Sequence, residues 1–269
     1  MAIYHFSAKA VKRSAGRSSV AAAAYRAGEK LFDSRTSTLH DYSRKQGVLH
    51  TSLHSPAGDL KISREAVWNL AEEAERRKDS CVAREYVVAL PAEISLERRI
   101  ALASAFASFL AKTQRCLVDC AVHAPSREGD SRNFHAHLLC TTREFDGASL
   151  GAKLVTERAG QNRKRNLNFL RLAWERVVNK ALELASETSR VDHRSYADQK
   201  RNVFPTKHLG AAATAIERRI KTPSQRRISW RESFEIAPGH AASRGQALEQ
   251  SKPFMQSTHQ HQKGSSYER

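Results

Sequence analysis

Two apolar segments on either side of a short polar one restrict the fold more than any other feature of this sequence. Residues 115–124 (RCLVDCAVHA) and 134–145 (FHAHLLCTTREF) are rich in strand-forming residues, and the segment between them, PSREGDSRN, is rich in turn formers. Apolar runs joined by such residues are typical of a β-hairpin. We therefore expect 115–124 and 134–145 to pair as antiparallel neighbours.

The second of these segments contains His135-Ala136-His137. Side chains alternate between the faces of a strand, so both imidazoles point to one side, about 7 Å apart along the backbone. If the hairpin forms, His123 at the end of the first segment reaches the same face. Three neutral imidazoles bind divalent transition metals and leave coordination positions open, for example for a phosphate oxygen. The spacing favours a catalytic metal site, although His-x-His pairs also arise by chance as half-buried polar residues.

The rest of the chain mixes strand and helix patterns. Short alternating segments predict strands at 2–11 and 84–90, and a hairpin over 38–55 that turns at Lys45-Gln46-Gly47. Serine N-caps begin three predicted helices: Ser18 or Ser19 before the helix that ends at about Lys30, Ser63 before 64–77 and Ser95 before 96–113. Further helices are expected at 166–186 and within 204–219, and beyond them the apolar periodicity stops.

Charge narrows the class of partner. The chain has 45 Lys and Arg residues against 28 Asp and Glu, a formal net charge of +17. Such an excess of positive charge favours a polyanionic binding partner, either nucleic acid or an anionic membrane surface. No apolar run of about 18 residues occurs and the N-terminus lacks a signal-peptide core, so we expect a cytosolic protein without membrane insertion. The four cysteines form no CxxC pair, which fits buried, reduced thiols.

One tyrosine lies in the alanine-rich segment SVAAAAYRAGEK, residues 19–30. A phenol with a pKa of about 10 is a poor nucleophile at neutral pH. A nearby metal ion or cation favours the phenolate, which can attack a phosphodiester and form a covalent phosphotyrosine. The small alanine side chains would let a DNA backbone approach closely. Tyr25 could also be a plain aromatic residue on a helix surface, but the expected metal site favours the nucleophile.

Several segments, in this order along the chain, resemble the MobA/MobL-type conjugative relaxases, the MobQ group of the HUH endonucleases (histidine, hydrophobic residue, histidine). The resemblance covers about residues 1–220, and the ordered combination is far more specific than any single motif. The segments are MAIYHFSAKAVKRSAGRSSVAAAAYRAGEKL at the N-terminus, REYVVALP at 84–91, AVHAP at 121–125, NFHAHLLCTTR at 133–143, RVDHRSYADQ at 190–199 and PTKHLGAAATAIERR at 205–219.

The resemblance implies an activity and a set of roles. It implies a site- and strand-specific nicking endonuclease and strand transferase that acts on single-stranded DNA at a plasmid transfer origin. Tyr25 would attack the scissile phosphate and leave a 5′-phosphotyrosyl link, and the reverse reaction would religate the strand. His123, His135 and His137 would hold Mg²⁺ or Mn²⁺. A carboxylate, Glu85 or else Asp119, would orient a ligand histidine or take the tyrosine proton.

The resemblance also implies a fold and partners. The fold would be α+β, an HUH-type central antiparallel sheet of about five strands with helices packed on one face and the active site on the other. The relaxase domain would span residues 1–220, with a C-terminal helical segment, and 221–269 would be a basic, flexible tail. Relaxosome accessory proteins and a type IV secretion coupling protein in the bacterial cytoplasm are the implied protein partners. The basic residues that would flank the DNA path are Lys9, Lys12, Arg13, Arg17 and Arg26.

Three points stay open in the sequence. A rolling-circle replication initiator would use the same histidines but a tyrosine after them, here Tyr196. A basic DNA-binding accessory protein would bind DNA without forming a covalent adduct. Phe134 stands where the family often has proline directly before the first histidine of the pair, and it could stack on a base or fill the core.

Overall fold

The computed structural model describes residues 2–58, 61–127, 130–157 and 160–200, together with residues 216, 217, 219 and 220. The chain divides into two compact units, Met1–Arg201 and Asn202–Arg269, and the account below concerns the first. The predicted helix within 204–219 is described at only three positions, and the predicted tail at 221–269 lies outside the described residues.

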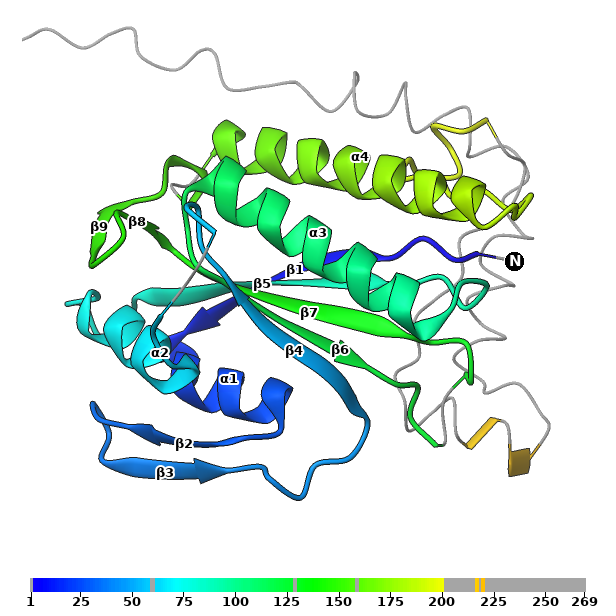
Figure 1. Cartoon of the computed structure of the whole chain (residues 1–269). Coiled ribbons are helices and arrows are strands. Elements are labelled where there is room, and N and C mark those ends of the chain that lie inside the picture. The colour runs from blue at the N-terminus through cyan, green and yellow to red at the C-terminus, as the bar shows by residue number, and fades with distance from the viewer. Residues whose placement is uncertain are drawn as a thin grey trace, which may run out of the picture. The chain divides into compact units, whose positions relative to one another are not determined.

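A five-stranded antiparallel sheet forms the centre of the first unit (Figure 1). The order across the sheet is β1 (Phe6–Lys12), β5 (Cys81–Ala89), β7 (His135–Thr141), β6 (Val118–His123) and β4 (Val48–His54). The predicted hairpin is confirmed, because β6 and β7 pair in antiparallel register with His123 opposite His135. The α+β class with a five-stranded antiparallel sheet is likewise confirmed.

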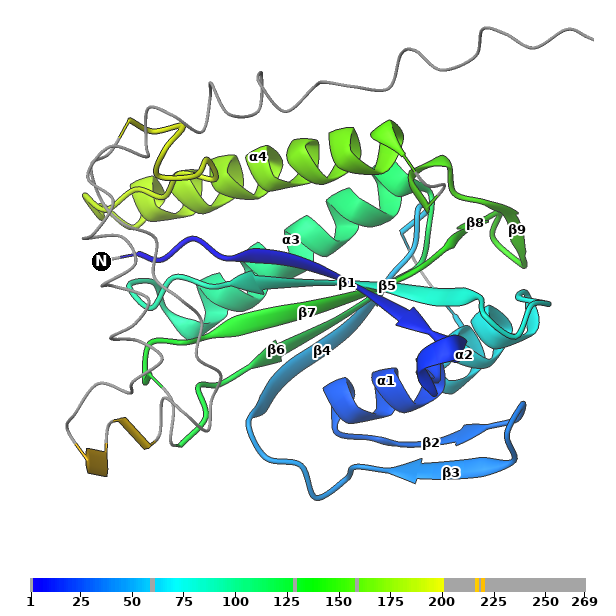
Figure 2. The same cartoon turned by 180° about the vertical axis from the view of Figure 1, so that it is seen from behind.

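Two long helices cover one face of this sheet, as Figures 1 and 2 show from opposite sides. They are α3 (Leu96–Gln114) and α4 (Gln161–Leu184). Alternate residues of β6 and β7, among them Val122 and Leu138, are fully buried with Phe106 and Trp174 of the helices in one apolar core. The predicted N-cap of α3 is confirmed, since the Ser95 side chain accepts a hydrogen bond from the Arg98 N–H.

The second face of the sheet also carries helices, which corrects the prediction that helices lie on one face only. The helices α1 (Ser19–Ala27) and α2 (Arg64–Glu73) cover one end of it, with Ser18 and Ser63 as their N-caps. Here the strands present apolar side chains on this face as well, for example Leu139, which are buried with Trp68 of α2. Such apolar surface requires a cover. The other end of this face holds the histidines.

The predicted hairpin over 38–55 is wrong. Instead β2 (Lys30–Asp33) pairs with β3 (Thr38–Asp41) in a separate ribbon, and β4 crosses to the sheet and pairs with β6. The turn between β2 and β3 includes Ser37 at a positive φ of 50°, an unusual conformation for serine that spacing does not reveal. The expected strand at 134–145 also divides, into β7 and β8 (Arg143–Phe145), and β8 pairs with β9 (Leu150–Lys153).

Two further expectations concern the whole chain. All four cysteines are free, and Cys116, Cys120 and Cys140 are buried as predicted, whereas Cys81 is only half-buried. Within the described ranges, no helix combines the length and the apolar character needed to cross a bilayer.

A buried carboxylate joins α2 to the start of α1. The Glu72 side chain is 1% exposed. Its Oε1 accepts hydrogen bonds from the backbone N–H of Ser19 at 2.7 Å and from its hydroxyl at 2.8 Å. Its Oε2 accepts from the guanidinium groups of Arg13 and Arg35, both at 3.0 Å from Nε. Glu72 therefore fixes the helix that carries Tyr25 against α2.

We expect Glu72→Ala to lower the free energy of unfolding by about 3–5 kcal/mol, because it leaves the buried Arg13 charge and the Ser19 N–H without their partner. Urea unfolding followed by tryptophan fluorescence measures the effect. Glu73→Ala, at the exposed neighbouring position, is the control and should change stability by less than about 0.5 kcal/mol. Equal unfolding midpoints for the two variants would contradict this role of Glu72.

Candidate active site

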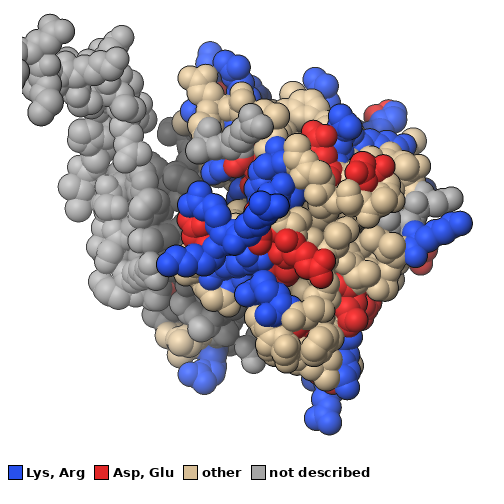
Figure 3. Space-filling view, turned by 90° about the vertical axis from the view of Figure 1, so that its left-hand side faces the viewer, with Lys and Arg blue, Asp and Glu red and all other residues tan. Residues whose placement is uncertain are grey.

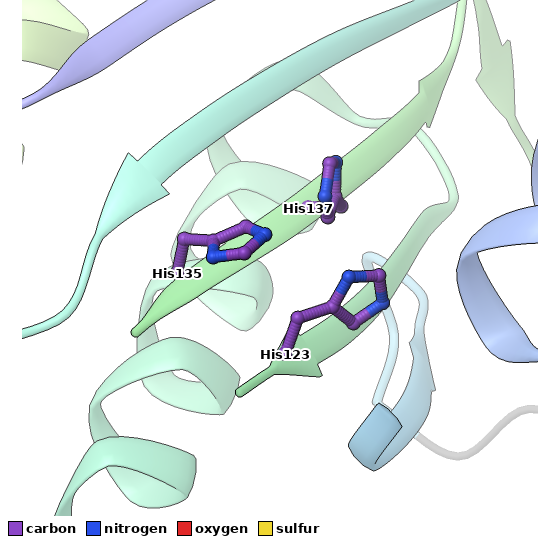
Figure 4. A group of neighbouring side chains, drawn as sticks. All are labelled: His123, His135 and His137. Carbon is purple, nitrogen blue, oxygen red and sulfur yellow. The ribbon is translucent and has the colours of Figure 1, made fainter. Parts of the chain in front are cut away.

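The three predicted metal ligands lie together on one face of the β6–β7 hairpin (Figure 4). His123 is directly opposite His135, and His137 follows two residues later on the same face of β7. The ring centroids are 4.7 to 5.4 Å apart. One ligand nitrogen from each ring lies within 4.8 Å of the other two. The register of β6 and β7 brings these three imidazoles together.

Each imidazole has one nitrogen already occupied by a hydrogen-bond acceptor. His135 Nδ1 lies 2.9 Å from the Asn133 carbonyl, His137 Nδ1 lies 2.7 Å from Glu85 Oε1, and His123 Nε2 lies 2.7 Å from the Arg26 carbonyl. Carbonyl and carboxylate oxygens accept, so these ring nitrogens carry the proton. The other nitrogens, Nδ1 of His123 and Nε2 of His135 and His137, keep their lone pairs for a metal ion.

Burial keeps two of these rings neutral. It lowers the pKa of His123 to about 3, and the charges of His137, Lys45 and His135 act in the same direction against the hydrogen bond to Arg26. Burial also lowers the pKa of His135. A metal ion binds the unprotonated ring, so these shifts leave both ligands available at neutral pH. The donor set therefore fits a divalent metal ion.

Glu85 is the buried carboxylate beside these ligands. Burial raises its pKa, but the hydrogen bonds from His137 and Arg26 and the charge of Arg26 outweigh it and lower the pKa to about 2. The Arg26 guanidinium contacts Glu85 Oε1 through Nε and the Ala22 carbonyl through Nη1, the latter at 2.8 Å. Asp119, the other candidate carboxylate, instead accepts hydrogen bonds from Arg64 and Trp68, both at 2.9 Å.

Tyr25 lies in the last turn of α1, with half of its surface exposed. The residue that follows it, Arg26, is bonded to His123 through its carbonyl and to Glu85 through its side chain. Two residues that the sequence did not assign to the site also contact the Tyr25 ring. The Lys45 ammonium lies 4.0 Å from the Tyr25 ring centroid, and the Tyr42 ring packs perpendicular to it at 5.3 Å. Both come from the connection between β3 and β4.

The five predicted DNA contacts divide into two groups. Lys9, Lys12 and Arg17 are exposed, and Lys9 lies opposite Glu85 in the sheet register, on the same face as the histidines. The side chains of Arg13 and Arg26 are only 10% and 18% exposed and form ion pairs with Glu72 and Glu85. Both arginines therefore hold protein elements together, and neither presents a free guanidinium.

Lysine and arginine side chains also gather on the side of the molecule that lies to the left in Figure 1, as Figure 3 shows. Exposed cations also follow α2, at Arg76, Arg77 and Lys78. A concentration of positive charge on one side fits a polyanionic partner.

Phe134 and Tyr196 have different surroundings. Phe134 packs against the apolar core under α3, and the Arg99 guanidinium lies 3.8 Å from its ring centroid, so it fills the edge of the core. Tyr196 is exposed. Three residues before it, His193 is bonded through its backbone N–H to Glu175 of α4, at 2.7 Å. The helix α4 covers the face of the sheet opposite the histidines.

Comparisons with known proteins agree on one family. The model of the MobA/MobL family matches residues 17–219. The mobilization protein MobL of Acidithiobacillus ferridurans is 39% identical over 263 residues, which cover 87% of this chain and 69% of MobL. The conjugal transfer protein TraA of Rhizobium radiobacter is 35% identical over 82% of this chain, but only 22% of TraA is covered.

A solved structure from a study of vancomycin resistance transfer in Staphylococcus aureus is also similar. It is 33% identical and superimposes with a TM-score of 0.63, covering 72% of this chain and all of that one. The family match, the identity to MobL and this shared fold lead to one conclusion. The chain belongs to the MobA/MobL family.

Proposed function

We propose that the chain is a relaxase, a metal-dependent transesterase that nicks one strand of single-stranded DNA at a plasmid transfer origin and later religates it. The observation that carries this proposal is the hydrogen bond from His123 to the backbone of the residue after Tyr25. This bond joins the helix that carries Tyr25 to the three-histidine cluster, which supports Tyr25 as the nucleophile. Membership of a family that includes mobilization and conjugal transfer proteins supports the proposal.

In the proposed reaction the Tyr25 oxygen attacks the scissile phosphorus. A bond forms from this oxygen to phosphorus as the bond from phosphorus to the 3′ oxygen breaks. The phenol proton is released, and the leaving oxygen takes up a proton to become a free 3′-hydroxyl, so the 5′ end stays on Tyr25. A divalent ion bound by the histidines would polarise the phosphate and stabilise charge on the leaving oxygen. Attack by the 3′-hydroxyl on the phosphotyrosine reverses the step.

Glu85 has an orienting role in this proposal. Its carboxylate holds the His137 ring through Nδ1 and is itself held by Arg26. A carboxylate with a pKa near 2 binds a proton too weakly to be an effective general base at neutral pH. Orientation of the ligand ring is the role that fits both the contacts and the charge.

The proposed substrate contacts are those of the exposed cations. Lys9, Lys12 and Arg17 would bind phosphates along the DNA path without reading the base sequence. Relaxosome accessory proteins and a type IV secretion coupling protein are the proposed partners, and the bacterial cytoplasm is the proposed location. A rolling-circle initiator that uses Tyr196 is a weaker alternative, because the segment before Tyr196 is attached to α4 on the opposite face.

We expect Tyr25→Phe to abolish the covalent protein–DNA adduct while leaving DNA binding unchanged, because only the attacking oxygen is removed. The assay is denaturing electrophoresis after incubation with Mn²⁺ and single-stranded oligonucleotides tiled across the transfer origin. Tyr196→Phe is the matched control and should form the adduct normally. An adduct that persists in Tyr25→Phe and disappears in Tyr196→Phe would establish the rolling-circle alternative. DNA binding without any adduct would favour an accessory protein.

The ligand set predicts that Mn²⁺ binds more tightly than Mg²⁺, because imidazole suits transition metals and Mg²⁺ prefers oxygen ligands. Isothermal titration calorimetry of the metal-free protein should show this order, and chelation by EDTA should stop cleavage. His135→Ala should weaken Mn²⁺ binding by at least about 100-fold. His54→Ala, on β4 and bonded to Ser52 and Ser108, should not change it. Equal affinity of wild type and His135→Ala would exclude this ligand set.

The orienting role of Glu85 predicts a specific pattern for Glu85→Gln. Mn²⁺ affinity should fall about 10-fold, as for other residues that orient metal ligands, and saturating Mn²⁺ should restore most of the cleavage rate. Glu73→Gln, at an exposed position on α2, is the control. A cleavage rate that stays lost at saturating Mn²⁺ would instead indicate that Glu85 takes part in proton transfer.

A further inference from the structure

The connection between β3 and β4, residues 42–47, contacts Tyr25 at three points, and we call it the 42–47 loop. Lys45 Nζ donates a hydrogen bond to the Tyr25 carbonyl at 2.7 Å, and the same ammonium lies 4.0 Å from the centre of the Tyr25 ring. The Tyr42 ring packs at 89° to the Tyr25 ring, with centroids 5.3 Å apart. Both are favourable geometries, a cation over an aromatic face and a perpendicular ring pair.

The helix itself does little to hold this ring. Side chains on a helix point back toward the residues three and four positions earlier, and for Tyr25 these are Ala22 and Ala21. Methyl groups offer an aromatic ring little surface to pack against. A half-exposed tyrosine in such a place would exchange between rotamers on the helix surface. The orientation of the ring therefore depends on the 42–47 loop.

The same loop is attached to the metal site. The Gly47 carbonyl accepts a hydrogen bond of 2.8 Å from the N–H of Ala124, the residue after His123. At its other end, the Tyr42 N–H donates to the Glu29 carbonyl, just beyond α1, at 3.1 Å. The loop thus connects the end of the nucleophile helix to the end of the strand that carries a metal ligand.

Glycine allows this close approach at the end of α1. Gly28 caps the helix with a left-handed φ of 67°, a conformation that favours glycine. A Cβ at this position would lie 3.3 Å from Val48 Cγ2 and 3.7 Å from the Lys45 carbonyl. The loop and the helix end are therefore packed directly against each other.

Lys45 holds its position at an electrostatic cost. Burial, together with the charge of the neighbouring Arg26, lowers the pKa of its amine to about 8. Its partners are a backbone carbonyl and a ring face, which offset this only in part. A partly buried cation that has no carboxylate partner among the residues the structure describes, and that lies beside the proposed nucleophile, is more typical of a functional site than of a stabilising contact.

We propose that Lys45, supported by Tyr42, is a positioning residue for the nucleophile. It fixes the Tyr25 ring and the last turn of α1 relative to His123, so that the hydroxyl is directed at the scissile phosphate before DNA binds. This inference rests on the proposed relaxase function. It means that the 42–47 loop aligns the Tyr25 ring, which the alanine-rich helix does not do by itself.

The test is the single-turnover cleavage rate at saturating oligonucleotide and Mn²⁺, with DNA affinity measured separately in EDTA, which stops cleavage. Lys45→Met should slow cleavage about 10- to 100-fold, because loss of alignment raises the barrier without changing binding. DNA affinity should change by less than about threefold, as expected for a residue that makes no major phosphate contact. Lys45→Arg, which keeps the cation and a donor, should restore most of the rate.

Matched variants separate positioning from charge and from packing. Arg44→Met removes the same charge at the exposed neighbouring position and should leave the rate unchanged. Tyr42→Phe keeps the ring contact and should cleave normally, whereas Tyr42→Ala should be slow. Lys45→Gln keeps a donor for the Tyr25 carbonyl without the cation, and an intermediate rate is expected.

Two results would overturn this inference. If Lys45→Met cleaves as fast as Arg44→Met, Lys45 does not position the nucleophile. If the cleavage rate and the DNA affinity of Lys45→Met fall together, Lys45 is a phosphate contact. The proposed function fails separately, because that failure appears as an absent adduct in the wild type or as cleavage by Tyr25→Phe. Normal melting temperatures for all variants would show that the rates do not reflect unfolding.

Discussion

The structure depends on how the last turn of α1 satisfies its backbone carbonyls. The final carbonyls of a helix have no partner within it and carry partial negative charge. Here the Ala24 carbonyl is capped by the Gly28 N–H, the Tyr25 carbonyl by Lys45 and the Arg26 carbonyl by His123. Two of these three donors come from elements outside the helix. The end of α1 is therefore held by His123 and by Lys45, which fix the backbone of the turn that carries Tyr25.

Glu85 completes this arrangement from the sheet side. One carboxylate oxygen accepts from Arg26 of α1 and from His137 of β7. The negative charge of Glu85 interacts with both the Arg26 guanidinium and the His137 ring. These interactions explain why the pKa of Glu85 is low in spite of its burial. Removing one partner of such a buried group leaves the other uncompensated. The three-histidine cluster and α1 are thus joined through both backbone and side chain, by His123 and by Glu85.

Local patterns in the sequence predicted the parts of the fold that local physics determines. Strand alternation placed His123, His135 and His137 on one face, and serine caps marked where α1, α2 and α3 begin. The hairpin at 38–55 was wrong because the short β2 strand precedes it and takes β3 as its partner. The ion pair between Arg26 and Glu85, which are 59 residues apart, was not predicted, because spacing carries no information about a contact of that range. For the same reason Lys45 was expected only in a turn, and its contact with Tyr25 was not predicted.

The alanines of α1 explain why a loop has to take part in the site. Ala23 and Ala24 are buried, and their small side chains let the helix lie close to the sheet, which brings the Arg26 carbonyl within reach of His123. Ala21 and Ala22, one turn before Tyr25, leave its ring without support from its own helix. The half-buried Ala22 also packs against the apolar core under α1 and α2, so a larger side chain there would disturb that packing. The 42–47 loop supports the ring from outside the helix, because Lys45 and Tyr42 contact it without adding bulk to α1.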